Sequence, residues 1–181
     1  RFCSRVRIAC FCILPLLKSV LAVTVAVSAL TVVVAAPAAR AAGTDTWVGN
    51  IDTNWNTAAN WTTVGGSTPP ANGDSLVFGT AGSSGIALYN DISSLTVGNL
   101  TFNSGASSFT IGGNTFTLGA GGVDASALSS GTMTITNVTT IGGPGVQRWN
   151  VGAGATIAFG KLGAGADAAD TYTPNGAIVL I

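Results

Sequence analysis

The sequence predicts an all-β protein whose short strands stack as a parallel β-solenoid. Between Leu95 and Phe159, short runs of Thr, Val, Ile, Phe and Leu alternate with small polar residues, the period-2 pattern of strands. Glycines cluster between the runs, at 112–113, 121–122 and 142–143, and glycine tolerates the backbone conformations of tight corners. Few two-residue hairpin turns separate the runs, which favours coils with loops of different length. An antiparallel β-sandwich is the alternative fold.

The expected strands are mostly short, and no amphipathic helix is evident after position 42. They cover 75–78, 86–89, 94–97, 100–103, 109–111, 115–118, 132–136, 139–141, 148–151, 156–159 and 178–181. Alternation predicts that one apolar set points inward and stacks between coils. This set is Val97, Leu100, Phe102, Phe109, Ile111, Phe116, Leu118, Ile135, Val138, Ile141, Val151, Ile157 and Phe159. With about 20–30 residues per coil, we expect about four or five coils.

The spacing of the motifs is irregular. A Thr-Val-Gly or Thr-Ile-Gly triplet begins at Thr96, Thr110 and Thr140, so the second interval is much longer than the first. The sequence therefore holds no strict repeat, although the triplets suggest related coils.

Residues 1–42 have the pattern of an export signal. A basic start is followed by two apolar runs, and Ala39-Arg40-Ala41 matches a small-residue cleavage site. The alternative is a signal anchor that stays in the membrane, because the second run approaches the ~20 residues that span a bilayer. We expect contact with a membrane only through this segment, and only during export. The chain begins with Arg1 and ends on an apolar run, so we expect it to be an N-terminal fragment with an incomplete last repeat.

Charge and residue types after position 42 exclude several functions. From Gly43 onward, two basic residues stand against seven aspartates, a net charge of −5, which argues against nucleic acid as a partner. All three cysteines precede Gly43, and the chain has no histidine. Disulfides, the usual catalytic triads and most zinc sites are therefore excluded from the later part. We expect no metal site and no cofactor.

The segment 43–80 is rich in tryptophan. Trp47, Trp55 and Trp61 lie close together in the sequence and are interspersed with asparagines. One interpretation is a glycan-binding platform, in which the ring faces stack on sugars and Asn or Asp side chains bind hydroxyls. The other is an N-terminal cap, whose large rings cover the open end of the strand stack. We favour the cap, since buried aromatic residues are more common than ligand-stacking ones.

This segment and the strands after it resemble bacterial proteins with the autotransporter-associated β-strand repeat. The similar motifs are Trp47-Val-Gly49, Trp55 to Trp61 with Asn60, Pro70 to Phe78 with Gly73-Asp74, Leu95 to Phe102, Phe116 to Gly122, and Gln147-Arg-Trp149-Asn-Val151. The resemblance covers most of residues 45–160. It implies a right-handed parallel β-helix, an autotransporter passenger-like region at the cell surface, without catalytic residues. The organisation that we expect is a signal peptide at 1–42, a cap at 43–80 and repeats at 81–181.

We therefore expect a bacterial protein that is secreted or attached to the outer membrane, with a structural or adhesive role and no enzymatic activity. Its partners would be extracellular glycans or other cells, and it would be monomeric. One alternative is a carbohydrate-binding module that uses the three tryptophans. Another is a polysaccharide-active β-helix enzyme with paired aspartates, for which Asp167 and Asp170 are the closest pair in sequence. Gly163 to Asp167 half-matches a calcium-binding repeat, but only once.

Overall fold

The computed structural model describes residues 41–142, 148–163, 171–174 and 176–181. Within them, secondary structure consists of β-strands and one short 3-10 turn, η1. The elements are β1 Thr44–Trp47, η1 Ala58–Asn60, β2 Trp61–Val64, β3 Ser75–Phe78, β4 Ala87–Asn90, β5 Leu95–Phe102, β6 Thr110–Gly113, β7 Phe116–Ala125, β8 Gly131–Ile141, β9 Arg148–Val151, β10 Ala155–Gly163, β11 Thr171–Pro174 and β12 Ala177–Leu180. Residues 1–40 of the predicted export signal lie outside the described residues.

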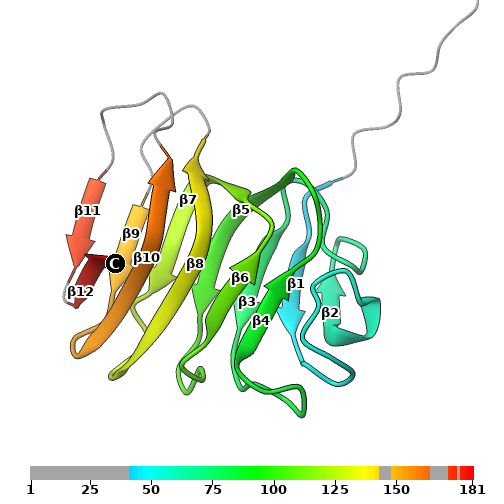
Figure 1. Ribbon diagram of the computed structural model, residues 1–181, viewed down its shortest axis with the longest axis horizontal. Helices are drawn as coiled ribbons and strands as arrows, with labels where there is room; N and C mark the ends of the chain where they lie inside the picture. Colours follow the sequence, from blue (N-terminus) through cyan, green and yellow to red (C-terminus); the bar gives the residue numbers. More distant parts are fainter. Residues whose placement is uncertain (1–40, 143–147, 164–170, 175) are drawn as a thin grey trace, which may run out of the picture. The chain divides into compact units, whose positions relative to one another are not determined.

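The strands pair in parallel and stack as a β-solenoid, from β2 at one end to β12 at the other (Figure 1). Among the described pairs, only β1 with β2 is antiparallel. Face 1 contains β1, β3, the second halves of β5 and β7, β9 and β11. Face 2 contains β4, β6, the first parts of β8 and β10, and β12, while face 3 contains the remaining parts of β5, β7, β8 and β10. The predicted solenoid is confirmed, and the antiparallel sandwich is wrong.

Coil length varies around a common value. On face 2, Ala87 pairs with Thr110 and Thr110 pairs with Thr134, so equivalent positions recur at nearly equal intervals. On face 1, the interval between Val123 and its partner Trp149 is slightly longer. The stack has about four turns, in agreement with the expected length and number of coils.

Two pairs of expected strands are single strands in the structure. The segments 94–97 and 100–103 form β5, and 132–136 with 139–141 form β8. The corner of β5 lies inside the strand, where the pairing register with β7 shifts between Val97 and Asn99. A Cβ atom on Gly98 would lie 2.7 Å from the carbonyl oxygen of Gly73, so glycine lets the chain turn close to the preceding coil without ending the strand.

The parallel ladder begins earlier than the expected start of the repeats at residue 81. β3 pairs in parallel with β5 on one side and with β1 on the other. The expected cap, 43–80, therefore supplies two strands of face 1, and β2 is the described strand that departs from the parallel pattern. Pairing between strands from different coils leaves no local signature in the sequence.

The core matches the predicted alternation. Of the expected inward residues, these are buried: Val97, Leu100, Phe102, Phe109, Ile111, Phe116, Leu118, Ile135, Val151, Ile157 and Phe159. Ile141 is partly buried against them, and the side chain of Val138 lies outside the described residues. The sequence analysis missed several further core residues: Leu76, Phe78, Leu88, Leu95, Val123, Met133 and Trp149.

One inward position of face 3 is polar. Thr139 pairs with Phe116 in one coil and with Leu162 in the next, and its side chain is fully buried. Its hydroxyl makes no hydrogen bond with the described residues. We expect Thr139→Val to raise the free energy of unfolding by about 1 kcal/mol, because valine has the same shape without an unsatisfied polar group. Urea unfolding measures this difference.

The matched control is Thr117→Val. Thr117 occupies an outward position of the same face, where its side chain is partly exposed, and its replacement should change stability by less than about 0.5 kcal/mol. A Thr139→Val variant less stable than the wild type would mean that the hydroxyl has a partner that holds it in place.

Candidate functional site

All three tryptophans of the expected glycan platform lie inside the protein. The exposed fractions of Trp47, Trp55 and Trp61 are 2%, 0% and 4%. A ring that stacks on a sugar must expose one face to solvent. In the described structure none of the three rings exposes such a face.

The three tryptophans form one cluster with the aromatic core of the first coils. Trp55 lies 6.0 Å from Trp61, 6.0 Å from Phe78 and 5.9 Å from Phe116, measured between ring centroids. Phe78 in turn stacks on Phe102 at 5.4 Å, its partner in the next coil. The indole Nε1 of Trp61 donates to the carbonyl oxygen of Trp55 at 2.8 Å. The rings therefore contact one another and close this end of the core.

A polar network shapes the loop that carries Trp55. The carboxylate of Asp52 accepts hydrogen bonds from the Asn54 amide, the Thr57 hydroxyl and the Asn60 carboxamide, at 2.7 to 2.9 Å. Asn60 is buried, and its side-chain oxygen accepts from the amides of Ile51 and Asp52. The hydrogen bond from the Asn54 amide, helped by those from Asn60 and Thr57, lowers the pKa of Asp52 below its ordinary value of 3.8. Asp52 is thus a structural acceptor that stays ionised.

Asp52 should make the stability of this loop depend on pH. A lowered pKa means that the stabilisation is complete above the ordinary pKa of 3.8 and is lost as pH falls through the lower, folded-state value. We expect Asp52→Asn to weaken protection of residues 51–60 from hydrogen exchange at pH 6, and to reduce the loss of protection on acidification to pH values below about 4. An unchanged acid profile in the variant would show that another group carries this pH dependence.

The other described aspartates with known partners also bind backbone groups. The carboxylate of Asp74 accepts from the amides of Gly43 and Ala71, and that of Asp91 accepts from the Asn56 amide at 2.7 Å. Asp124 accepts from the amide and hydroxyl of Ser126. Within the described ranges, no three His, Cys, Asp or Glu side chains gather where they could hold a metal ion. Asp167 and Asp170 lie outside the described residues.

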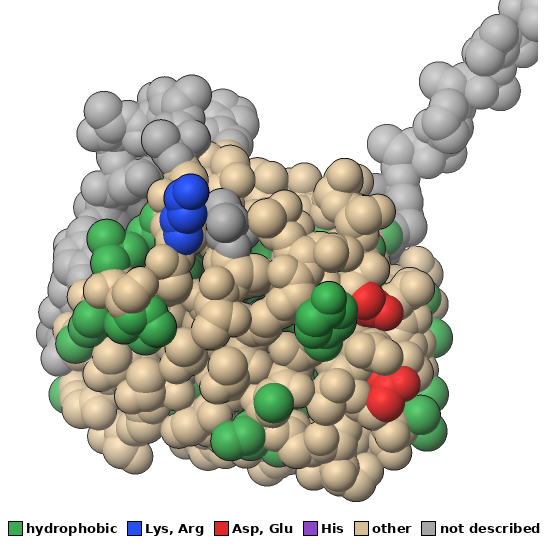
Figure 2. Space-filling model, in the orientation of Figure 1, with side chains coloured by type: hydrophobic (Ala, Val, Ile, Leu, Met, Phe, Trp, Pro, Cys, Tyr) green, Lys and Arg blue, Asp and Glu red, His purple; other side chains and the backbone are tan. Residues whose placement is uncertain are grey.

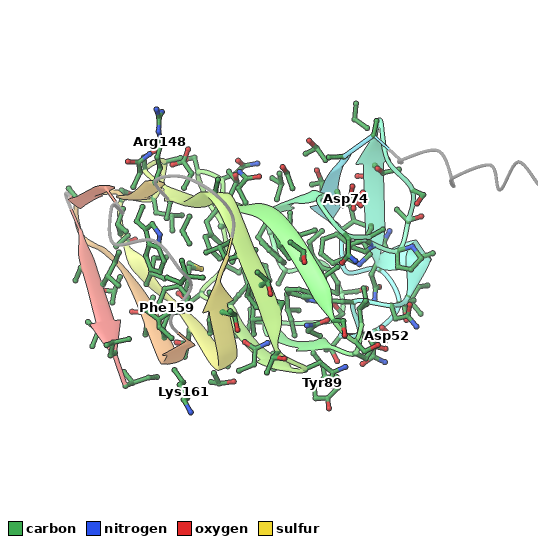
Figure 3. All side chains as sticks on the ribbon, turned by 90° about the horizontal axis from the view of Figure 1, so that it is seen from above. Asp52, Asp74, Tyr89, Arg148, Phe159 and Lys161 are labelled. Carbon is green, nitrogen blue, oxygen red and sulfur yellow. The ribbon has the colours of Figure 1, made fainter. Side chains whose placement is uncertain are left out.

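Tyr89 is the surface residue that the sequence analysis missed. It lies on β4, where Leu88 and Asn90 point inward and Tyr89 points outward, with half of its side chain exposed. Asn54 is its partner in an isolated parallel bridge on one side, and Gly112 of β6 is its partner on the other. Figure 3 shows Tyr89 projecting from the same side of the solenoid as Asp52. Alternation within 86–89 could have placed this ring outside.

Comparison with known proteins adds no further assignment. No protein-family model, curated protein or solved structure matches the chain. Among the described residues, no helix has the length and hydropathy that crossing a membrane requires.

Proposed function

We propose that this protein is an exported, non-catalytic β-solenoid of the bacterial cell surface, similar to an autotransporter passenger, with a structural or adhesive role. The signal pattern of residues 1–42 supports export, and the order of the motifs from Trp47 to Val151 supports the passenger-like assignment. The solenoid fold is compatible with both, since stacked coils present long faces to partners.

The proposal rests on the roles of the described side chains, which are used for packing and for holding loops. Apolar residues fill the interior, and four of the carboxylates in the described residues accept hydrogen bonds that hold loops and turns. Among the described residues, the face in Figure 2 is mostly tan, the colour of uncharged polar side chains and backbone, with few charged side chains. Outward positions on face 2 carry Thr110, Thr132, Thr134 and Thr136, which are small and neutral. This surface suits weak, repeated contact over a broad area.

Export can be tested with the full chain in a Gram-negative host. We expect the protein to leave the cytoplasm and to lose its leader at the small-residue site that ends the segment 1–42, so that mass spectrometry finds Ala42 or Gly43 as the first residue. A matched chain without residues 1–42 should stay in the cytoplasm. An uncleaved chain in the cytoplasmic fraction would overturn the proposal.

A further inference from the structure

We infer that the surface around Tyr89 binds neutral glycans, with the tyrosine ring as the stacking platform. This inference rests on the proposed adhesive function and gives it a site and a ligand class. It moves the glycan contact from the three buried tryptophans to an exposed ring on face 2.

The ring of Tyr89 is exposed to solvent. These tryptophan and phenylalanine side chains are buried: Trp47, Trp55, Trp61, Trp149, Phe78, Phe102, Phe109, Phe116 and Phe159. Tyr89, in contrast, has 50% of its surface accessible. A ring in solvent adds little to the stability of the fold, whereas an exposed ring face attracts the C–H groups of a sugar through its negative quadrupole.

The sheet surface on one side of the Tyr89 ring carries no side chain at the next outward position. The next outward residue across the sheet is Gly112, and the one after it is Thr136 of β8. A Cβ atom at Gly112 would lie only 3.2 Å from the Thr136 hydroxyl oxygen. Because glycine has no Cβ atom, the surface between Tyr89 and Thr136 stays free of side-chain atoms. A sugar ring could rest on the glycine backbone, beside the tyrosine and within reach of the Thr136 hydroxyl.

Polar groups lie on the other side of the Tyr89 ring. Asn54 lies directly beside Tyr89, and its hydrogen bonds within the described residues use its backbone, which leaves its carboxamide for a ligand. Asn56 is exposed, and its amide binds Asp91, which follows Tyr89 closely in the chain. Carboxamides, carboxylates and hydroxyls donate to and accept from sugar hydroxyls, and a few such groups beside an apolar surface are typical of ligand sites.

The platform is rigid before a ligand arrives. The amide of Tyr89 donates to the carbonyl oxygen of Thr53 at 2.9 Å, and the amide of Trp55 donates to that of Tyr89 at 3.0 Å. The strand is thus held on this side by the same loop that the Asp52 network shapes. Binding then costs little ordering of the protein.

The charge of the site selects among glycans. The charged residues nearest to it along these segments are acidic, Asp52 and Asp91. The negative charges of these aspartates would repel a uronic-acid polymer, so we assign the site to neutral polysaccharides.

Affinity electrophoresis of the full chain tests the inference, with laminarin, dextran, xylan and hydroxyethyl cellulose as neutral probes and alginate as the acidic one. We expect at least one neutral polymer to retard the protein, and alginate not to. Tyr89→Ala should weaken that binding by about tenfold or more, as for a central aromatic anchor, while Tyr89→Phe should retain it. The control is Val64→Ala, a change at an 80% exposed residue of β2 outside the site.

Absence of retardation by all four neutral polymers would overturn the inference, as would equal binding by Tyr89→Ala. Circular dichroism shows whether Tyr89→Ala is folded. If it is not, Asn54→Ala takes its place and should weaken binding at least threefold. Leader cleavage and export do not depend on this site, so a protein that is exported but binds no glycan would refute the site alone.

Discussion

Replacing Trp55 by alanine is expected to lower the free energy of unfolding by about 3–5 kcal/mol, as for other large aromatic residues in cores. Trp55 is fully buried, and its ring lies within 6.0 Å of the rings of Trp61 and Phe78. The loop that carries it ends at Asn60, whose hydrogen bonds depend on the same compact geometry. Urea unfolding, followed by circular dichroism, measures the loss.

Trp55→Phe is the matched control. The Nε1 atom of Trp55 makes no hydrogen bond with the described residues, so phenylalanine loses ring area but no polar contact. It should cost clearly less than alanine. The same variants separate the two interpretations of the tryptophans. A Trp55→Ala protein with wild-type stability and no glycan binding would contradict the buried cluster and restore the tryptophan platform.

Much of this fold can be predicted from short-range patterns in the sequence. Alternation between Leu95 and Phe159 places every second side chain on one side of a strand, and Phe102, Ile135 and Phe159 are buried as it predicts. Glycine clusters mark the corners because a close approach of two coils leaves no space for a Cβ atom, as at Gly98. These features need only the next few residues of the chain, so the sequence alone reveals them.

What the sequence could not reveal depends on contacts between distant residues. The triplets at Thr96 and Thr140 occupy face 3 and share the partner Thr117, whereas the one at Thr110 lies on face 2. Equal motifs thus occupy different faces, and the true coil length is set by pairing rather than by the motif. The candidate site shows the same limit. Tyr89 lies beside Asn54 only because the entry loop pairs with β4.

Gly122→Ala should be the most damaging change at a corner, with an expected loss of about 2–5 kcal/mol. Gly122 has φ +64, where an alanine costs about 1–2 kcal/mol because of its Cβ atom. In addition, that Cβ atom would fall on the carbonyl oxygen of Arg148, in the adjacent coil. The clash would force apart β7 and β9, which pair from Val123 onward.

Gly105→Ala isolates the contribution of this clash. Gly105 has φ +79, but a Cβ atom there would meet nothing within 4 Å. It should therefore lose only the about 1–2 kcal/mol of backbone strain, and the difference between the two variants in urea unfolding reports the contact between coils. Equal losses would mean that the coils can separate at Gly122 without cost. The solenoid would then be held together by its buried ladder of side chains, and close approach of the backbones at this corner would contribute nothing.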